Sequence, residues 1–257
     1  MPQSRRRFIA TSSAALGMTV ILPFAARAAS HSQDEFTTSA GTITVHPVSH
    51  ASFVMETPAG VIYCDPVGKV EAYAKFPRPD LILITHHHGD HYKEETLNGI
   101  VSDKTKIITN PTVFDKLSDN LKSKASKIAN GETTSSLGIK IEAIPAHNIT
   151  AGREKFHPKG RDNGYVLTIN DYRIYISGDT EDVPEMRALT NIDLAFVCMN
   201  LPFTMDVAAA AAAVAEFKPK VVYPYHYRGR DGGTQDPNEF AKLIGDNAKV
   251  NLGPWYG

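Results

Sequence analysis

Thr85-His86-His87-His88-Gly89-Asp90-His91 is the stretch of sequence that decides the fold. It directly follows Leu81-Ile82-Leu83-Ile84, a continuous apolar run typical of a strand that is buried on both faces. The stretch offers four imidazoles and one carboxylate, the ligand types that zinc and similar ions take. The alternatives are a chance surface cluster or a metal-storage tract, neither of which needs partners elsewhere in the chain. The stretch therefore predicts a metal site at a strand end.

Three possible partners occur further along the chain, each at the end of a short apolar run. They are His147, Asp179 and His226. Taken singly, an aspartate in a Gly-Asp-Thr sequence is commonly a turn former, and a histidine beside tyrosines is commonly a core or surface residue. Taken together, all three end predicted strands, as the histidine cluster does. We therefore expect them to converge with that cluster on one edge of the fold.

The rest of the chain mixes predicted strands with predicted helices. Strands are predicted at 43–45, 52–56, 61–64, 81–84, 107–109, 139–144, 165–169, 172–176, 194–198 and 221–223. Helices are predicted at 111–121, 206–217 and 237–245. Asn170-Asp171 between two strands is a hairpin signal. Hairpins mixed with strand–helix units indicate an α/β sandwich rather than a doubly wound sheet.

With this motif and its spaced partners, the chain resembles the metallo-β-lactamase superfamily. It looks most like the branch of ascorbate-6-phosphate lactonase and N-acyl-phosphatidylethanolamine-hydrolysing phospholipase D. The segments that carry the resemblance are His50-Ala51-Ser52-Phe53, Cys64-Asp65-Pro66, Asn163-Gly164-Tyr165-Val166, Gly178-Asp179-Thr180 and Pro224-Tyr225-His226. The resemblance implies an αββα sandwich over residues 41–257, with mixed sheets and helices on the outer faces.

The resemblance also implies two divalent metal ions, zinc by default and manganese or iron as alternatives. The first ion would be held by three histidines, namely His86, His88 and His147. The second would be held by one carboxylate and two histidines, namely Asp90, His91 and His226. Asp179 would bridge the two ions. β-Lactamases of this fold generally carry a cysteine or no ligand at the bridging position, so this residue resembles that of the general hydrolases.

Other residues near the predicted ligands are given supporting roles. Asp65, at a predicted strand end, would accept the second ring N–H of a metal-binding histidine; the alternative is an Asp-Pro turn without a catalytic part. His157 lies in a loop and is predicted to bind substrate, although it competes with His147 for the first ion. We favour His147, because it comes directly off a strand and a ligand needs a rigid base. His46 and His50 are interpreted as structural or pocket-wall residues.

The predicted chemistry is hydrolysis by a metal-bridging hydroxide, because two ions lower the pKa of a shared water molecule. Asp90 would orient this hydroxide as well as bind metal. An ester, lactone, amide or phosphodiester bond in a small-molecule substrate suits such a site. A basic loop at 148–163 either holds an anionic substrate group or is a solvated loop; its basic members are Arg153, Lys155, His157, Lys159 and Arg161. The alternative function is a non-catalytic metal- or ligand-binding protein that retains the fold.

Residues 1–28 are interpreted as an export signal, followed by a polar linker at 29–40. Ser4-Arg5-Arg6-Arg7-Phe8-Ile9 precedes an apolar stretch and Ala26-Arg27-Ala28. The adjacent arginines resemble a twin-arginine (Tat) signal, which implies the Tat export machinery as a partner and a periplasmic or otherwise exported protein. The alternatives are a basic N-terminus without a targeting role and a retained membrane anchor.

Charge and hydropathy narrow the choice of partners. Residues 1–28 hold four arginines and no acidic residue, which leaves 23 of the 27 basic residues against 28 acidic ones. No electrostatic footprint for nucleic acid remains. No later stretch has the ~18 apolar residues of a membrane span. Cys64 and Cys198 lie in apolar runs and are predicted to be buried free thiols, with a disulfide as the alternative. The oligomeric state is not determined by the sequence.

Overall fold

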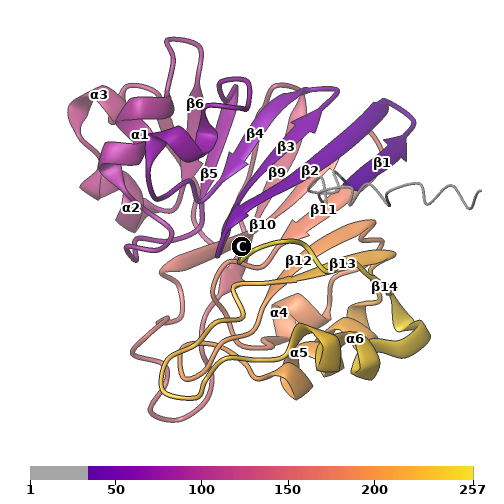
Figure 1. Cartoon of the computed structure of the whole chain (residues 1–257). Helices are drawn as coiled ribbons and strands as arrows, with labels where there is room; N and C mark the ends of the chain where they lie inside the picture. Colours follow the sequence, from indigo (N-terminus) through magenta and orange to yellow (C-terminus); the bar gives the residue numbers. More distant parts are fainter. Residues whose placement is uncertain (1–33, 257) are drawn as a thin grey trace, which may run out of the picture. The chain divides into compact units, whose positions relative to one another are not determined.

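The computed structural model describes residues 34–256, which form two seven-stranded sheets packed face to face (Figure 1). In spatial order, the first sheet consists of β1 (Asp34–Thr38), β2 (Gly41–Ser49), β3 (Ser52–Thr57), β4 (Gly60–Cys64), β5 (Leu81–Ile84), β6 (Lys106–Thr109) and β7 (Ala125–Lys127). The second consists of β14 (Lys249–Val250), β13 (Val221–Tyr225), β12 (Leu194–Cys198), β11 (Tyr172–Ile176), β10 (Asp162–Ile169), β9 (Ile139–Ala146) and β8 (Thr133–Ser136). Both sheets are mixed, as the sandwich prediction requires.

Each central strand of the first sheet is buried on both faces, because side chains alternate along a strand. In β5, Leu81 and Leu83 join the core between the sheets. Ile82 and Ile84 point the other way and pack with helix residues. Phe53 of β3 stacks on Phe196 of β12 across the sandwich, with ring centroids 4.1 Å apart. This two-sided burial explains why β5 reads as an unbroken apolar run.

Helices cover the outer face of each sheet. α1 (Glu94–Ile100), α2 (Pro111–Lys116) and α3 (Asp119–Lys122) lie beside β5 and β6, and α4 (Pro184–Arg187), α5 (Val207–Phe217) and α6 (Pro237–Ile244) lie beside β12 to β14 (Figure 1). α5 starts where the Asp206 carboxylate accepts a hydrogen bond from the backbone N–H of Ala209, at 2.8 Å. The alanine-rich helix and the helix after Asp236 are therefore confirmed.

Two sequence predictions need correction. The predicted linker at 29–40 contains β1, which pairs antiparallel with β2, so the polar Asp34–Thr38 segment is an edge strand and not a linker. The predicted helix at 111–121 is two short helices, because the backbone is extended at Leu117. Ser118 and Asp119 favour a helix start over a helix interior, which accounts for the break. The hairpin at Asn170 is confirmed, with β10 and β11 in antiparallel register.

The predicted signal at 1–28 lies outside the described residues. Within residues 34–256, no helix is both long and apolar enough to cross a bilayer. The sulfur atoms of Cys64 and Cys198 are both buried and unbonded, which confirms the prediction of free thiols.

Candidate metal centre

The site residues lie where strands of both sheets end. Parallel neighbours β4 and β5 end at Asp65 and at the histidine stretch, and β11 and β13 end shortly before Asp179 and His226. The carboxyl ends of parallel strands share one edge of a sheet, which is why segments distant in sequence meet there. The structure shows the predicted convergence for Asp179 and His226.

The first group of possible ligands consists of His86, His88 and His157. One ring nitrogen from each lies within 4.8 Å of the others. Nε2 of His86 is 3.1 Å from Nδ1 of His88, and Nε2 of His157 is 3.4 Å from Oδ2 of Asp179. His86 and His157 are fully buried, so these rings face one another and not water. Three imidazoles at this spacing suit one zinc-like ion.

The second group shares the same aspartate. Nε2 of His91 is 3.4 Å from Oδ1 of Asp179, and Nε2 of His226 is 3.6 Å from that same oxygen. All three atoms are buried, and none has a hydrogen-bond partner among residues 34–256. Buried polar atoms without partners are rare in proteins, because each costs about 1–3 kcal/mol. Three of them converging on one point are the arrangement that a cation would satisfy.

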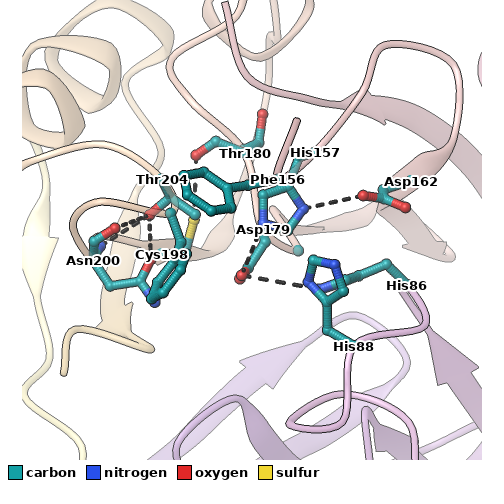
Figure 2. A network of polar contacts seen from close by, with 12 residues as sticks. His86, His88, Phe156, His157, Asp162, Asp179, Thr180, Cys198, Asn200 and Thr204 are labelled. Atoms are coloured by element: carbon teal, nitrogen blue, oxygen red, sulfur yellow. Dashed lines mark hydrogen bonds and ion pairs between the residues drawn. The ribbon is translucent and has the colours of Figure 1, made fainter. Parts of the chain in front are cut away.

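Asp179 lies between the two groups. Its Oδ1 faces His91 and His226, and its Oδ2 faces His157 and, at 3.9 Å, His86. Figure 2 shows this carboxylate between the rings of His86 and His157. Gly178 makes the position possible, since a Cβ there would lie 2.9 Å from the carbonyl oxygen of Asn163. The carboxylate thus has one oxygen for each group, which is the geometry that a bridging ligand needs.

The pKa values of two rings in the first group are lowered, which favours the uncharged form that binds a cation. Burial, and next the nearby His157, lower the pKa of His88 to about 4. Burial, and next the nearby His91, hold the pKa of His86 well below its ordinary value. Both rings are therefore uncharged near neutral pH, which is the form that binds metal.

The second group is charged. Burial would lower the pKa of His91, but the carboxylates of Asp179 and Asp65 outweigh it and raise that pKa well above its ordinary value. Burial likewise opposes ionisation of Asp179, yet His226 and His91 hold the pKa of this carboxyl well below its usual range. Without a metal ion, positive charge on His91 therefore compensates the buried carboxylates.

Asp65 fixes the start of the histidine stretch. Its carboxylate accepts hydrogen bonds from the backbone N–H of Thr85 at 2.7 Å and from the Thr85 hydroxyl at 2.6 Å. Its Oδ2 also contacts Nδ1 of His91 at 2.7 Å, and both side chains are fully buried. That contact leaves Nε2 of His91 facing Asp179, as a ligand held by a carboxylate would be.

Asp90 lies at the rim of the site, with 47% of its side chain exposed. Its Oδ2 is 3.3 Å from Nε2 of His226 and 3.3 Å from Nε2 of His50. His50 in turn contacts the Tyr256 hydroxyl through Nδ1, at 2.7 Å. The backbone N–H of Arg228 donates to that same hydroxyl. The ionised Asp90 carboxylate can only accept, so Nε2 of His50 donates to it, and Nδ1 of the neutral ring accepts from the Tyr256 hydroxyl.

Three of these residues have a left-handed backbone. His50, Asp65 and His226 have φ values of 56°, 42° and 49°. Such φ values cost a non-glycine residue of order 1–3 kcal/mol and occur preferentially at functional sites. Each of the three is the residue that turns the chain at the site, so the strain is concentrated where the possible ligands are aimed.

The ring of His226 is held from behind. Nδ2 of Asn200 lies 2.7 Å from Nδ1 of His226. Oδ1 of Asn200 accepts a hydrogen bond from the Thr204 hydroxyl at 2.6 Å (Figure 2). All three side chains are buried. These contacts fix the orientation of the ring, with Nε2 of His226 toward Asp179.

His147, the expected third ligand of the first ion, is not part of either group among the described residues. The backbone N–H of His147 donates to the Thr180 hydroxyl at 3.0 Å, and its carbonyl accepts from the backbone N–H of Glu181. Its ring is buried, and burial lowers its pKa. The physical reason for the difference is direction: β9 continues to Ala146, and its end is bound to the segment after Asp179 rather than aimed at His86.

His157 lies beside His86 and His88, where His147 was expected. Its loop has no regular secondary structure, but several hydrogen bonds hold it in place. Nδ1 of His157 lies 3.0 Å from Oδ2 of Asp162, the first residue of β10, as Figure 2 shows. Arg161 forms two hydrogen bonds of 2.8 Å to the same carboxylate. The carbonyl of His157 accepts from the backbone N–H of Asn148 at 2.8 Å. These contacts turn Nε2 of His157 toward the site.

Sequence reasoning missed several residues that shape the site. His50 was interpreted as structural or as pocket wall, but it contacts Asp90 directly. Asn200 and Tyr256 carry no sequence signal, because their roles depend on segments that meet only in three dimensions. Asp162 did carry a sequence signal. It follows His157 by five residues and lies just before the predicted strand at 165–169, so a carboxylate was available close to that ring. His46 pairs with Glu56 at 2.9 Å and takes no part in the centre.

Comparison with known proteins identifies the family. Residues 44–226 match the family model described as the beta-lactamase superfamily domain. The chain belongs to the metallo-β-lactamase superfamily. It is 32% identical to a UPF0173 metal-dependent hydrolase of Pyrococcus abyssi, over 81% of this chain and 95% of that protein. A solved structure from Parabacteroides distasonis, described as a candidate metal-dependent hydrolase, is 40% identical. Its TM-score is 0.78, over 88% of this chain and 100% of the other.

Within this superfamily, the chain is a metal-dependent hydrolase with a histidine–aspartate cluster able to hold metal. A metallo hydrolase of Ignicoccus hospitalis has a TM-score of 0.68 over 82% of this chain and 94% of that one. At 23% identity it shows a shared fold alone. The predicted branch, with the lactonase and the phospholipase, stays a prediction.

Proposed function

We propose that this protein is a dinuclear metal-dependent hydrolase that cleaves an ester, lactone, amide or phosphodiester bond in a small molecule. One observation carries the proposal: Nε2 of His91, Nε2 of His226 and Oδ1 of Asp179 converge while buried, and none of them forms a hydrogen bond within the described part of the chain. In the metal-free chain the charge on His91 compensates the Asp179 carboxylate, and a bound cation would take over that role while accepting all three atoms as ligands.

The donor set suits two divalent ions. His86, His88 and His157 would hold the first ion, Asp90, His91 and His226 the second, and Asp179 would contact both. When bound, two such ions supply Lewis acidity and lower the pKa of a water molecule, so that a hydroxide nucleophile exists near neutral pH. Zinc fits the imidazole majority, and the two carboxylates make manganese and iron suitable alternatives.

The chain itself positions the reacting groups. Asp90 is half exposed, so its carboxylate reaches the pocket and can accept a hydrogen bond from the attacking water. His50 donates to Asp90 and thereby limits the rotation of that carboxylate. Asp65 and Asp162 hold the rings of His91 and His157 through Nδ1. These four residues define the direction of attack before substrate arrives.

Hydrolysis is tested with the reconstituted protein on a panel of chromogenic esters, lactones and phosphodiesters. We expect turnover that falls by more than about 100-fold in Asp90→Ala, because an oriented carboxylate contributes on the order of 10²–10⁴. Asp103→Ala, which removes an exposed carboxylate outside the site, is the control and should keep full activity. Absence of turnover across the panel at two bound metal ions per chain would support the non-catalytic binding protein instead.

We also propose that residues 1–28 direct export by the twin-arginine route, which places the protein in the periplasm or outside the cell. The support is the order of the basic, apolar and Ala-x-Ala segments in the sequence. Changing Arg5 and Arg6 to lysine should retain the protein in the cytoplasm, as measured by fractionation. An unchanged periplasmic yield would refute the route.

A further inference from the structure

The candidate metal centre opens into a pocket of about 540 Å³, within the size range of small-molecule sites. Phe156 and Phe203 form an apolar part of its lining, with ring centroids 5.0 Å apart in an edge-to-face arrangement. Arg230 lines the same pocket, together with the site residues Asp90 and His157. The pocket therefore combines an apolar wall with one guanidinium, beside the proposed reaction centre.

The two arginines of the predicted basic loop are already engaged with carboxylates of the protein. Arg153 pairs with the buried Glu181 at 2.6 Å and donates to the carbonyl of Thr204. Arg161 is bound to the carboxylate of Asp162. A guanidinium that neutralises a buried carboxylate cannot also hold substrate without leaving that charge unpaired. The predicted basic loop at 148–163 thus uses its arginines to fix its own shape.

Arg230 differs because no ion pair involves it among the residues that the structure describes. Neighbouring Arg228 is not equivalent, since its guanidinium lies 4.2 Å from the centre of the Tyr256 ring. Arg230 is exposed toward solvent and lines the pocket, so its guanidinium is available to a ligand. Among the described residues, Arg230 is the single arginine that lines the pocket.

The loop that carries Arg230 is built against the loop that carries Phe203. The backbone N–H of Leu201 donates to the carbonyl of Gly233 at 3.0 Å, and the N–H of Gly233 donates to the carbonyl of Arg230 at 2.7 Å. A Cβ on Gly229 or Gly233 would lie 2.3 Å or 1.9 Å from the carbonyl oxygen of Leu201. The close approach needs glycine at both positions and places Arg230 and Phe203 on one joined wall.

We propose that Arg230 anchors an anionic group of the substrate, remote from the bond that is cleaved, while Phe156 and Phe203 hold its apolar body. The substrate class is then a small amphiphilic anion, with a carboxylate or phosphate at one end and an aromatic or aliphatic portion next to the hydrolysed bond. A guanidinium recognises either anion through two parallel hydrogen bonds. The inference rests on the proposed function, because it assigns the substrate of that same site.

Binding is measured by calorimetry on the metal-loaded protein with three phenyl-bearing probes: 4-phenylbutyrate, its neutral amide, and 3-phenylpropyl phosphate. The quantity compared is the ratio of the dissociation constants of the amide and each anion. In Arg230→Ala this ratio should fall about tenfold, as loss of one solvent-accessible charged hydrogen-bond pair predicts. Arg230→Lys should keep part of it. Lys159→Ala, which removes an exposed cation outside the pocket lining, should leave it unchanged.

Turnover separates this inference from the proposed function. 4-Nitrophenyl hydrogen succinate carries a carboxylate away from the cleaved aryl ester, and its methyl ester replaces this charge with a neutral methoxycarbonyl group; Arg230→Ala should raise KM about tenfold for the acid alone. If neither ester nor any panel substrate is cleaved while the binding ratio still depends on Arg230, the hydrolase proposal fails and the anion site stands. If the ratio is the same in Arg230→Ala and the wild type, the metal ions hold the anion and the inference is wrong. A preference for only one anion assigns the charged group.

Discussion

His147 and His157 lie in the same connection between β9 and β10, yet only one of them reaches the centre. His147 directly follows the strand, and its backbone is bound to Thr180 and Glu181. His157 lies in an irregular loop, and its ring faces Asp179 with the carboxylate of Asp162 behind it. Hydrogen bonds can therefore hold a ring in an irregular loop in the orientation that the proposed metal ligand needs.

The loop is held in place by Arg153 and Arg161, two of the basic residues that the sequence suggested for substrate. Glu181 accepts hydrogen bonds from the backbone N–H groups of Ile149 and Thr150, and Arg153 pairs with the same carboxylate. Arg161 completes the support of His157 through Asp162. Substitutions that remove one of these contacts at a time test why the ring of His157, and not that of His147, faces the centre.

The largest effect is expected from His157→Ala. It removes one of three proposed ligands of the first ion, so metal content should fall from two ions toward one, and activity by more than about 100-fold. Elemental analysis and turnover measure both. The matched control is His147→Ala, which should keep two ions and most activity. The opposite pattern would restore the assignment that the sequence favoured.

A smaller effect is expected from Asp162→Asn. The amide keeps the size of the side chain but loses the charge behind the His157 ring, and such changes typically cost 10–100-fold in metal affinity. The affinity of the first ion, measured by chelator competition, should weaken while that of the second stays within about threefold. An equal loss at both sites would mean that Asp162 supports the fold and not one ring.

The two ions should also respond differently to pH. The pKa of His86 is lowered and that of His88 is about 4, so these two rings release no proton when the first ion binds between pH 6 and 8, and its affinity should change less with pH than that of the second ion. In the metal-free chain the raised pKa of His91 keeps that ring protonated, so binding there must release a proton. The second affinity should therefore rise about tenfold per pH unit. If chelator competition shows the same pH dependence for the affinities of both ions, the proposed difference in charge between the two groups is wrong.

The smallest effect is expected from Arg153→Ala. Glu181 keeps its two backbone donors, so the free energy of unfolding should fall by only about 1–2 kcal/mol. Denaturant unfolding measures this, and elemental analysis should still find two ions. Loss of metal equal to that of His157→Ala would show that the whole loop, and not the Asp162 contact, positions the ligand.

Much of the fold was predictable because its strands are simple. β5 and β12 are unbroken apolar runs, and the Asn170 turn determines a hairpin locally. β1 was not recognised, since its alternation of exposed and half-buried polar residues resembles a linker until β2 lies beside it. α1 was missed as well, because its short amphipathic pattern depends on packing against the outer face of the first sheet.

The site residues also divide into those that the sequence reveals and those that only the folded chain reveals. His86, His88, Asp90 and His91 are close in sequence, so their proximity is a local property that the motif reveals. The choice between His147 and His157 depends on how the connection at 147–161 turns, which the contacts of Asp162 with His157 and of Glu181 with Ile149 determine. Arg230 was not recognised for the same reason, since its place in the pocket depends on the contact between Gly233 and Leu201.

Anomalous diffraction from crystals of the zinc-reconstituted protein tests the central claim most directly. Two peaks are predicted, each about 2.0–2.3 Å from its ligand atoms. The first should lie among the ring nitrogens of His86, His88 and His157. The second should lie among Asp90, His91 and His226, with Asp179 contacting both. Absence of any peak in the site, or a first peak bound by His147 with His157 turned away, would contradict the account.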